Sequence, residues 1–262
     1  MTDGLDEEQL AARLRAAESS RLGITPVRMS TVDASVTSAY RIQSINTGIR
    51  VDAGERIVGR KIGLTSAAVQ RQLGVDQPDF GVLFDTMQVP DGGTLSIREL
   101  LSPRIEAEIA FILKDDLAGP ALTLTEVRAA VECVLPCLEI VDSRIAGWDI
   151  GIFDTVADNG SASRFVTGST RRPLDGFDCV NCLMEMRSGD SVVATGRGSA
   201  SLGDPLNALW WLANKALELD RPLRAGEIIL SGALGPMAPV LPGRAYTAAI
   251  EGLGTVTVRF EL

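Results

Sequence analysis

Residues 103–113 read PRIEAEIAFIL, and this stretch decides the fold. Its isoleucines and phenylalanine predict a strand, and side chains alternate between the two faces of a strand. One face carries apolar residues throughout, whereas the other carries Glu106 and Glu108 and then turns apolar at Ala110 and Ile112. A solvated face would stay polar along its length. We therefore expect both glutamates at the mouth of a buried face.

A third isolated glutamate, Glu139, lies in a second apolar stretch, PCLEIV, at residues 136–141. Glu106 and Glu108 are two residue rises apart, roughly 6.6 Å, so their flexible side chains can converge on one cation. Buried carboxylates repel one another and lose hydration, so they need a cation or a proton. Oxygen ligands alone suit a hard ion such as Mg2+ or Mn2+. The alternative left open is an edge strand whose glutamates are solvated and paired with Arg104 or Arg144.

The remainder of the chain predicts an α+β fold. Helical spacing predicts one helix that begins at Asp3 or Asp6 and a second from about Val32 to Gly54. After residue 56 strand-like segments dominate, and the helices do not alternate regularly with them, which favours a mostly antiparallel sheet system over a doubly wound sheet. We therefore predict a helical N-terminal region over residues 1–55 and a β-rich domain over residues 56–262.

Local signals predict several boundaries in the β-rich domain. The capping box Thr123-x-x-Glu126 begins one helix, and Asp204 followed by Pro205 begins another. Residues 66–74 predict a short helix, and the sequence Asp-Gly-Gly at 91–93 predicts a hairpin turn.

Three further segments carry weaker signals. Residues 179–186 predict a strand, and residues 148–160 predict a loop. Asp79 lies in the sequence QPDFG, where a Pro/Gly-rich turn accounts for an aspartate without any function.

The composition excludes several classes of function. The chain of 262 residues contains no histidine, which excludes Ser-His-Asp and Cys-His catalysis and any histidine-containing zinc or haem site. The 25 Lys and Arg residues against 34 Asp and Glu residues give a net charge of −9, which argues against nucleic acid or an anionic membrane as a partner. A small anionic substrate stays possible, because a local cation or a metal can outweigh the net charge.

The four cysteines, at positions 133, 137, 179 and 182, could in principle form a four-thiolate zinc site. They lie in apolar segments without the glycine-rich knuckles of such sites, so we interpret them as buried free thiols. No apolar run is long enough to span a bilayer, and the acidic N-terminus is unlike a signal peptide, so we expect a cytoplasmic protein.

Lys61 and a polar loop are further candidates for a functional site. Lys61 lies in the strand-like sequence GRKIGLT, where apolar neighbours predict partial burial, and a buried lysine either pairs with a carboxylate or has a lowered pKa. A plain surface ion pair is the alternative. Asn159 and Ser161, in ADNGSAS, are by themselves compatible with an ordinary polar loop.

Seven segments together resemble one family. Taken in order, the sequence is similar to the 2-hydroxypenta-2,4-dienoate (2-keto-4-pentenoate) hydratases of the fumarylacetoacetate hydrolase superfamily, from about residue 35 to the end. The segments are GRKIGLTS, LGVDQPDFGVLF, PRIEAEIAFIL, LPCLEIVDSRI, DTVADNGSASRFVTG, GRGSASLGDPLNALWWLA and GEIILSGALGPM.

The resemblance implies a fumarylacetoacetate-hydrolase-like mixed β-sandwich or β-roll after the helical region, assembled as a homo-oligomer. It implies Mg2+ or Mn2+ held by Glu106, Glu108 and Glu139, with Lys61 and Asp79 as catalytic residues. Asn159 and Ser161 would bind the substrate. The implied enzyme is a hydro-lyase that adds water to a 2-hydroxy-2,4-dienoate and gives a 4-hydroxy-2-oxoacid in aromatic or steroid meta-cleavage catabolism.

Two alternatives to the hydratase function stay open, and a third is disfavoured. The sister enzyme, 4-oxalocrotonate (2-oxohex-3-enedioate) decarboxylase, would use the same metal site, although the segments around residues 147–159 and 231–237 are more similar to the hydratases. A non-catalytic partner subunit of such an enzyme is a second alternative, and association with a pathway decarboxylase or aldolase is expected in either case. Hydrolytic C–C bond cleavage is disfavoured, because that chemistry resembles attack by water with the help of a histidine, and the chain contains no histidine.

Overall fold

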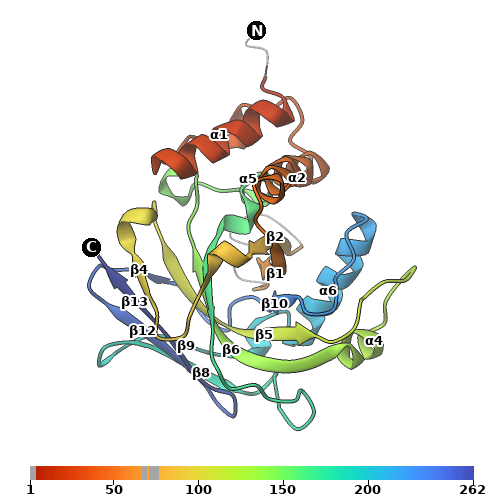
Figure 1. Ribbon diagram of the computed structural model, residues 1–262, viewed down its shortest axis with the longest axis vertical. Coiled ribbons are helices and arrows are strands. Elements are labelled where there is room, and N and C mark those ends of the chain that lie inside the picture. Colours follow the sequence, from red (N-terminus) through yellow and green to blue (C-terminus); the bar gives the residue numbers. More distant parts are fainter. Residues whose placement is uncertain (1–3, 67–69, 71–76) are drawn as a thin grey trace.

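The computed structural model describes residues 4–66, 70 and 77–262 and confirms the α+β class (Figure 1). Two mixed β-sheets form the body of the molecule, and two N-terminal helices lie across one side of it. Most strand pairs are antiparallel, and the parallel pairs are β1 with β10, β3 with β7 and β4 with β13.

The larger sheet has eight strands and contains both glutamate strands. Its order is β2-β1-β10-β5-β6-β7-β3, and β11 pairs with the first part of β5. The strands are β1 (Ile57–Gly63), β2 (Asp79–Phe84), β3 (Gln88–Val89), β5 (Arg104–Leu113), β6 (Val131–Val141), β7 (Ala162–Thr167), β10 (Ile228–Leu230) and β11 (Ala238–Pro239). Since β5 has partners on both sides, the alternative of an edge strand with solvated glutamates is wrong.

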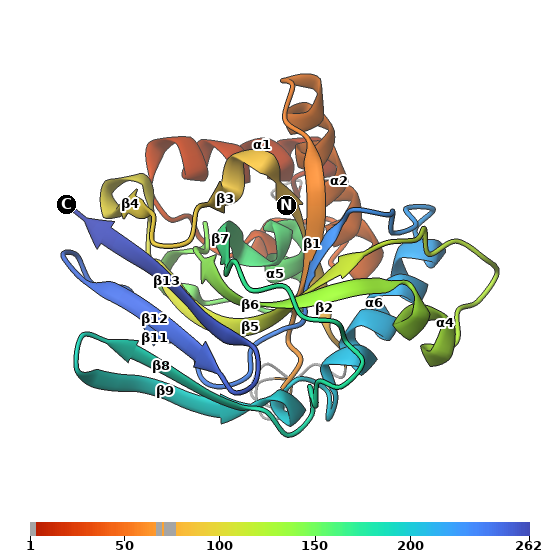
Figure 2. The same ribbon diagram turned by 60° about the horizontal axis from the view of Figure 1, so that its bottom comes forward.

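The smaller sheet has five strands in the order β4-β13-β12-β8-β9 and lies against β6 and β7 (Figure 2). Its strands are β4 (Thr94–Ser96), β8 (Leu183–Ser188), β9 (Ser191–Arg197), β12 (Ala245–Ile250) and β13 (Gly254–Glu261). Ile105, Ile109 and Phe111 of β5 are fully buried in the same core as Val256 and Val258 of β13. The alternation predicted for residues 103–113 therefore places one face of β5 in this core and the glutamates on the other.

The N-terminal region contains α1 (Glu7–Ser20) and α2 (Val36–Asp52), which pack on each other. Asp6 caps α1 through a capping box, and Ser35 rather than a residue near Val32 caps α2. Helix α2 also packs on α5 (Ile152–Ala157), which belongs to the β-rich part. The division of the chain at residue 55 stays a prediction.

Both predicted helix starts in the β-rich part are confirmed. The capping box of Thr123 and Glu126 begins α4 (Leu124–Ala129). Asp204 caps α6 (Pro205–Glu218), with Pro205 in the first turn. The helix predicted at 66–74 falls largely outside the described residues.

Other local predictions are wrong, and each error has a tertiary cause. The turn at residues 91–93 joins strands of different sheets, since β3 pairs with β7 whereas β4 pairs with β13. The predicted loop at 148–160 contains α5, and β8 begins at Leu183 rather than at Cys179. Asp79 is the first residue of the fully buried strand β2 rather than part of a turn.

None of the helices in the described ranges has the length and apolar character required to cross a membrane.

Candidate active site

The three glutamates predicted to hold a metal converge. Glu106 is the Cα partner of Glu139 in the antiparallel pair β5–β6, and Glu108 lies two residues further along the same face of β5. One carboxylate oxygen from each residue lies within 4.8 Å of the others. Glu108 and Glu139 are fully buried, whereas Glu106 is partly exposed to a cavity. This is the only such acidic, Cys or His group of three or more within residues 4–66, 70 and 77–262.

Burial controls the charge of these carboxylates. Burial, followed by repulsion from Glu139, raises the pKa of Glu106 to about 7. Burial and both neighbouring glutamates raise the pKa of Glu108 well above its usual range. Burial also raises the pKa of Glu139, although Lys61 opposes that shift. The cluster is therefore unfavourable as three free carboxylates and requires protons or a cation.

The oxygen atoms of the cluster fit a divalent cation. Glu108 Oε2 accepts a hydrogen bond from the Gly232 backbone N–H at 2.8 Å. Within the described part of the chain, Glu108 Oε1 and Glu139 Oε2 have no hydrogen-bond partner, and Glu139 Oε1 faces the Lys61 ammonium. Unpartnered buried oxygens are costly, and a carboxylate-only set is the ligand chemistry that Mg2+ and Mn2+ favour.

Lys61 lies directly beside this cluster. Its Nζ donates a hydrogen bond to the Gly160 carbonyl at 2.9 Å and lies 3.2 Å from Glu139 Oε1. Burial alone would lower the pKa of Lys61, but attraction to Glu139 and the other nearby carboxylates outweighs it and raises the pKa. The ammonium therefore stays charged, and the surface ion pair considered for Lys61 is wrong.

Asp79 lies next to Lys61, on the neighbouring strand. Its Oδ2 accepts a hydrogen bond from the Thr155 hydroxyl of α5 at 2.7 Å, and its buried Oδ1 has no partner among the described residues. A Cβ at Gly63, the Cα partner of Asp79, would lie 2.2 Å from that Oδ1. Glycine at position 63 is thus what leaves space for the carboxylate.

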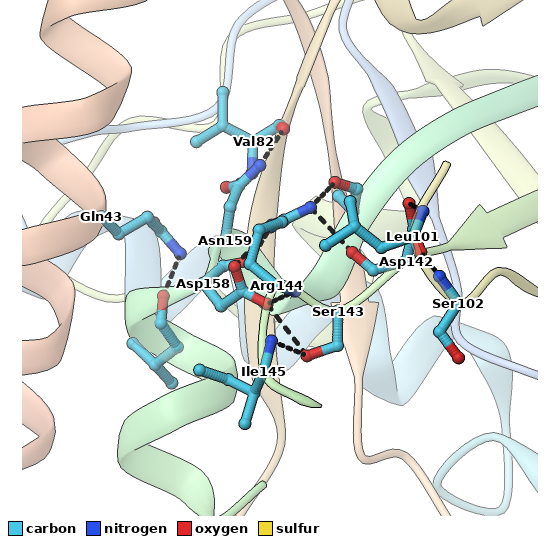
Figure 3. Close-up of polar contacts among 12 residues, drawn as sticks. Gln43, Val82, Leu101, Ser102, Asp142, Ser143, Arg144, Ile145, Asp158 and Asn159 are labelled. Atoms are coloured by element: carbon cyan, nitrogen blue, oxygen red, sulfur yellow. Dashed lines mark hydrogen bonds and ion pairs between the residues drawn. The ribbon is translucent and has the colours of Figure 1, made fainter. Parts of the chain in front are cut away.

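The loop at residues 158–161 presents Ser161 but not the Asn159 side chain. Ser161 Oγ is buried in the cavity without a hydrogen-bond partner in the described structure. The Asn159 amide instead accepts from Val82 N at 2.7 Å and donates to Val82 O at 2.9 Å (Figure 3). Asn159 lines a different cavity, beneath α1 and α2, so the structure does not bring its side chain to the predicted site.

A buried ion pair fixes the base of this loop (Figure 3). The Arg144 guanidinium contacts both the carboxylate and the backbone carbonyl of Asp158. It also donates to the carbonyls of Asp142 at 2.9 Å and Ala162 at 3.1 Å. Burial, partly offset by Arg144, raises the pKa of Asp158 to about 6. The sequence reasoning considered Arg144 only as a partner for the glutamates, and this role is wrong.

The cavity beside the cluster has a volume of about 410 Å3, within the usual range for small-molecule sites. Lys61, Asp79, Glu106, Thr155 and Ser161 supply its polar wall. Leu64, Val141, Trp148, Ile150 and Met237 supply much of its apolar lining. Thr155, Trp148 and Met237 were missed by the sequence reasoning, because their roles depend on contacts between distant segments.

The four cysteines are free and buried, as interpreted from the sequence. Cys133 and Cys137 lie on β6, and Cys137 is the Cα partner of Glu108. Cys179 and Cys182 lie in the turn before β8.

A mixed two-sheet fold with buried carboxylates around a small-acid-sized cavity defines a class of enzyme that binds a divalent metal through oxygen ligands. The family model described as fumarylacetoacetate (FAA) hydrolase C-terminal matches residues 58–261. The chain belongs to this family, and the fold inferred from the resemblance is confirmed.

Full-length relatives support the narrower resemblance as well. The chain is 48% identical over 261 residues to a 2-keto-4-pentenoate hydratase of Paraburkholderia phymatum, with complete coverage of both chains. It is 50% identical over 254 residues to one of Paraburkholderia xenovorans, covering 97% of this chain and 94% of the relative. A solved structure of 4-oxalocrotonate decarboxylase from Pseudomonas putida G7, complexed with magnesium and adipate, matches with a TM-score of 0.91 and 36% identity, covering 99% of this chain and 100% of the other.

Proposed function

We propose that this protein is a divalent-metal-dependent hydratase, a hydro-lyase that converts a 2-hydroxy-2,4-dienoate into a 4-hydroxy-2-oxoacid in meta-cleavage catabolism. The observation that carries the proposal is the convergence of Glu106, Glu108 and Glu139 beside Lys61, at the polar wall of a small cavity. The full-length similarity to 2-keto-4-pentenoate hydratases supports the reaction type.

Glu106, Glu108 and Glu139 would hold Mg2+ or Mn2+. A divalent ion held by these carboxylates would supply Lewis-acid stabilisation of the negative charge that develops on the C2 oxygen of the substrate. The buried position of Glu108 and Glu139 excludes water from one side of the cluster, which strengthens every electrostatic interaction there.

Lys61 would stabilise or protonate the substrate oxygen at C2. Its ammonium is fixed by Gly160 O and Glu139, so it is oriented before the substrate arrives. In the proposed reaction the dienol is ketonised by a proton at C5, water adds at C4 and C3 takes a second proton. Each step changes the charge on the C2 oxygen, and a fixed cation beside that oxygen lowers the barrier.

Asp79 would act as the base that removes a proton from the attacking water. Thr155 occupies one oxygen of its carboxylate, and the other oxygen is free to accept that proton. Ser161 would donate its free hydroxyl to the substrate. The unpartnered oxygens of both residues support these roles, since general-base catalysis needs an acceptor within hydrogen-bond reach.

The test follows loss of dienoate absorbance and appearance of 4-hydroxy-2-oxoacid with Mg2+, with Mn2+ and with EDTA. We expect hydration that requires the metal and no release of CO2. Full activity in EDTA would refute the metal dependence. If the protein binds no metal and hydrates no dienoate, the result would favour the non-catalytic partner subunit, since such a subunit needs no metal ion.

The decarboxylase is the second candidate, since the 36% identical structural neighbour that spans the whole chain has that activity in its name. Supplying 2-oxohex-3-enedioate and measuring CO2 separates the two reactions. Stoichiometric CO2 release faster than hydration would assign the decarboxylase.

We propose in addition that the chain forms a homo-oligomer in the cytoplasm and associates with a pathway decarboxylase or aldolase. The similarity of its fold to a decarboxylase over the full length supports a shared mode of assembly. Light scattering of the purified protein, alone and mixed with such an enzyme, tests the homo-oligomer and the association.

A further inference from the structure

The cavity becomes apolar in one direction along the sheet. From the glutamate cluster, β5 continues on the same face from Glu106 to Arg104, and β6 continues from Glu139 to Val141. Arg104 and Val141 are Cα partners, so this is one direction for both strands. Trp148, Ile150 and Met237 line the cavity at this end, and we call these three residues the apolar wall.

Polar contacts outside the cavity hold two members of the apolar wall in place. Trp148 Nε1 donates to Ser102 O at 3.0 Å and also lies 3.2 Å from Ser102 Oγ. The Arg104 guanidinium lies 4.6 Å from the centre of the Trp148 ring, and its Nη1 lies 3.4 Å from the Met237 sulfur. Cation–π contact and these hydrogen bonds fix the indole and the thioether before a ligand binds.

We propose that the apolar wall takes the uncharged end of the substrate beyond C5 and that Trp148 limits its length. This inference rests on the proposed function and assigns to Trp148 the discrimination among dienoates that differ in the group at C5.

Distances along the strand support a short group. Glu106 and Arg104 are two rises apart, roughly 6.6 Å. The three bonds from C2 to C5 span about 3.6 Å, the length of one extended residue. About two further carbons would therefore reach the apolar wall when the C1 and C2 oxygens lie at the cluster.

Charge supports the same conclusion. A carboxylate at the far end of the substrate would lose hydration against Trp148 and Met237. The Arg104 guanidinium, which contacts both side chains, does not itself line the cavity. Among the cavity-lining residues that the structure describes, Lys61 is the one cation, and it lies at the glutamate end.

The first experiment measures kcat/KM on 2-hydroxy-2,4-dienoates whose C5 carries hydrogen, methyl, propyl or carboxylate. For the native protein we expect a preference of about fourfold for methyl over hydrogen, as for one buried methyl group. We expect propyl and carboxylate to be at least about tenfold worse than methyl, on the scale of pocket discrimination. Trp148→Ala should raise the propyl-to-methyl ratio at least about tenfold.

Ile150→Ala provides a second variant if Trp148→Ala does not fold, and it should shift the same ratio in the same direction. The control is Trp210→Phe, which alters a tryptophan of α6 outside the cavity and should leave the relative kcat/KM values of the four substrates unchanged.

A binding experiment separates this inference from the proposed reaction. Calorimetry with Mg2+ and the unreactive 2-oxopentanoate, 2-oxohexanoate and 2-oxoadipate should show weaker binding of the dicarboxylate, and Trp148→Ala should favour longer chains. The inference would be overturned if 2-oxoadipate bound as tightly as the monocarboxylates. It would also be overturned if the Trp148 and Ile150 variants changed the affinity for every ligand by one common factor. Failure to hydrate any dienoate while the binding order holds would overturn the proposed reaction alone.

Discussion

Glu106 and Glu139 face each other as Cα partners across β5 and β6, and the Lys61 ammonium lies 3.2 Å from Glu139. Three elements that are distant in the sequence therefore meet at one charged point inside an apolar core. With Glu108 included, three acidic side chains surround one fixed ammonium, so a divalent cation would balance the remaining charge.

Glu108→Gln should abolish stabilisation by Mg2+. The amide retains the shape and accepts the Gly232 hydrogen bond, but it removes a charged ligand. We expect the melting temperature of the native protein to rise with Mg2+ concentration and that of the variant to stay constant. Without metal at pH 8, the variant should be more stable than the native protein, because glutamine requires neither the burial of a charge nor the uptake of a proton at this position.

The matched control is Glu132→Gln, at an exposed position of the same strand β6, which should keep the full response to Mg2+. An unchanged Mg2+ response in Glu108→Gln would remove this residue from the metal site.

The stability of the metal-free protein should fall as the pH rises from about 5 to about 7. The pKa of Glu106 is raised to about 7, so in this range the native state binds a proton that the unfolded state has released. One such proton lowers the free energy of unfolding by up to about 1.4 kcal/mol per pH unit, and the exposure of Glu106 to the cavity reduces that value.

Urea unfolding at several pH values in EDTA measures this slope, and saturating Mg2+ should flatten it, because the bound ion replaces the proton. A metal-free protein that becomes more stable between pH 5 and 7 would contradict the raised pKa values of the cluster.

The grouping of the three glutamates was predictable because each one interrupts an apolar strand. Alternation placed Glu106 and Glu108 on one face, and the isolated position of Glu139 marked it in the same way. The register that puts Glu139 opposite Glu106 was not predictable. It depends on where β5 ends and β6 begins, with α4 in the connection, and no local signal fixes that count.

The loop at 158–161 shows what the family resemblance could not predict. Asn159 and Ser161 are polar residues separated by Gly160, and the resemblance implies that both bind the substrate. All three residues from Asn159 to Ser161 have positive φ, so the backbone turns between the two side chains and only Ser161 reaches the cavity. The turn predicted at Asp79 is wrong for a related reason. The contact that orients its carboxylate comes from Thr155 of α5, a helix that the sequence analysis did not predict.

Lys61→Met should lower kcat by about 10²- to 10⁴-fold, the usual range for loss of a proton-transfer or charge-stabilising group. Methionine fills a similar volume, so the fold should persist, although Glu139 loses its ion pair. Lys215→Met, which breaks only an exposed pair with Glu218, is the matched control and should keep normal kcat. Steady-state kinetics with Mg2+ decide the matter, and a near-normal kcat in Lys61→Met would exclude Lys61 from the mechanism.

Asp79→Asn should lower kcat more than Thr155→Val does. The first change removes the proposed base, whereas the second removes only the hydroxyl that orients it. We expect a loss of at least about 10²-fold for Asp79→Asn and a smaller loss for Thr155→Val, with a shifted pH profile of kcat in the latter. Equal kcat values for Asp79→Asn and the native protein would reassign the base to one of the glutamates.

Asp158→Asn should destabilise the protein by about 3–5 kcal/mol, because it leaves the buried Arg144 guanidinium without its counter-charge. Asp175→Asn, which breaks the exposed pair with Arg128, should cost less than about 1 kcal/mol and serves as the control. Urea denaturation measures both values. Because Asp158 begins the loop that presents Gly160 to Lys61, the folded fraction of Asp158→Asn should also show a reduced kcat with Mg2+ stabilisation retained. If the two substitutions lower the free energy of unfolding equally, the Arg144–Asp158 pair does not stabilise this loop. The pair would then have no part in positioning Gly160 against Lys61.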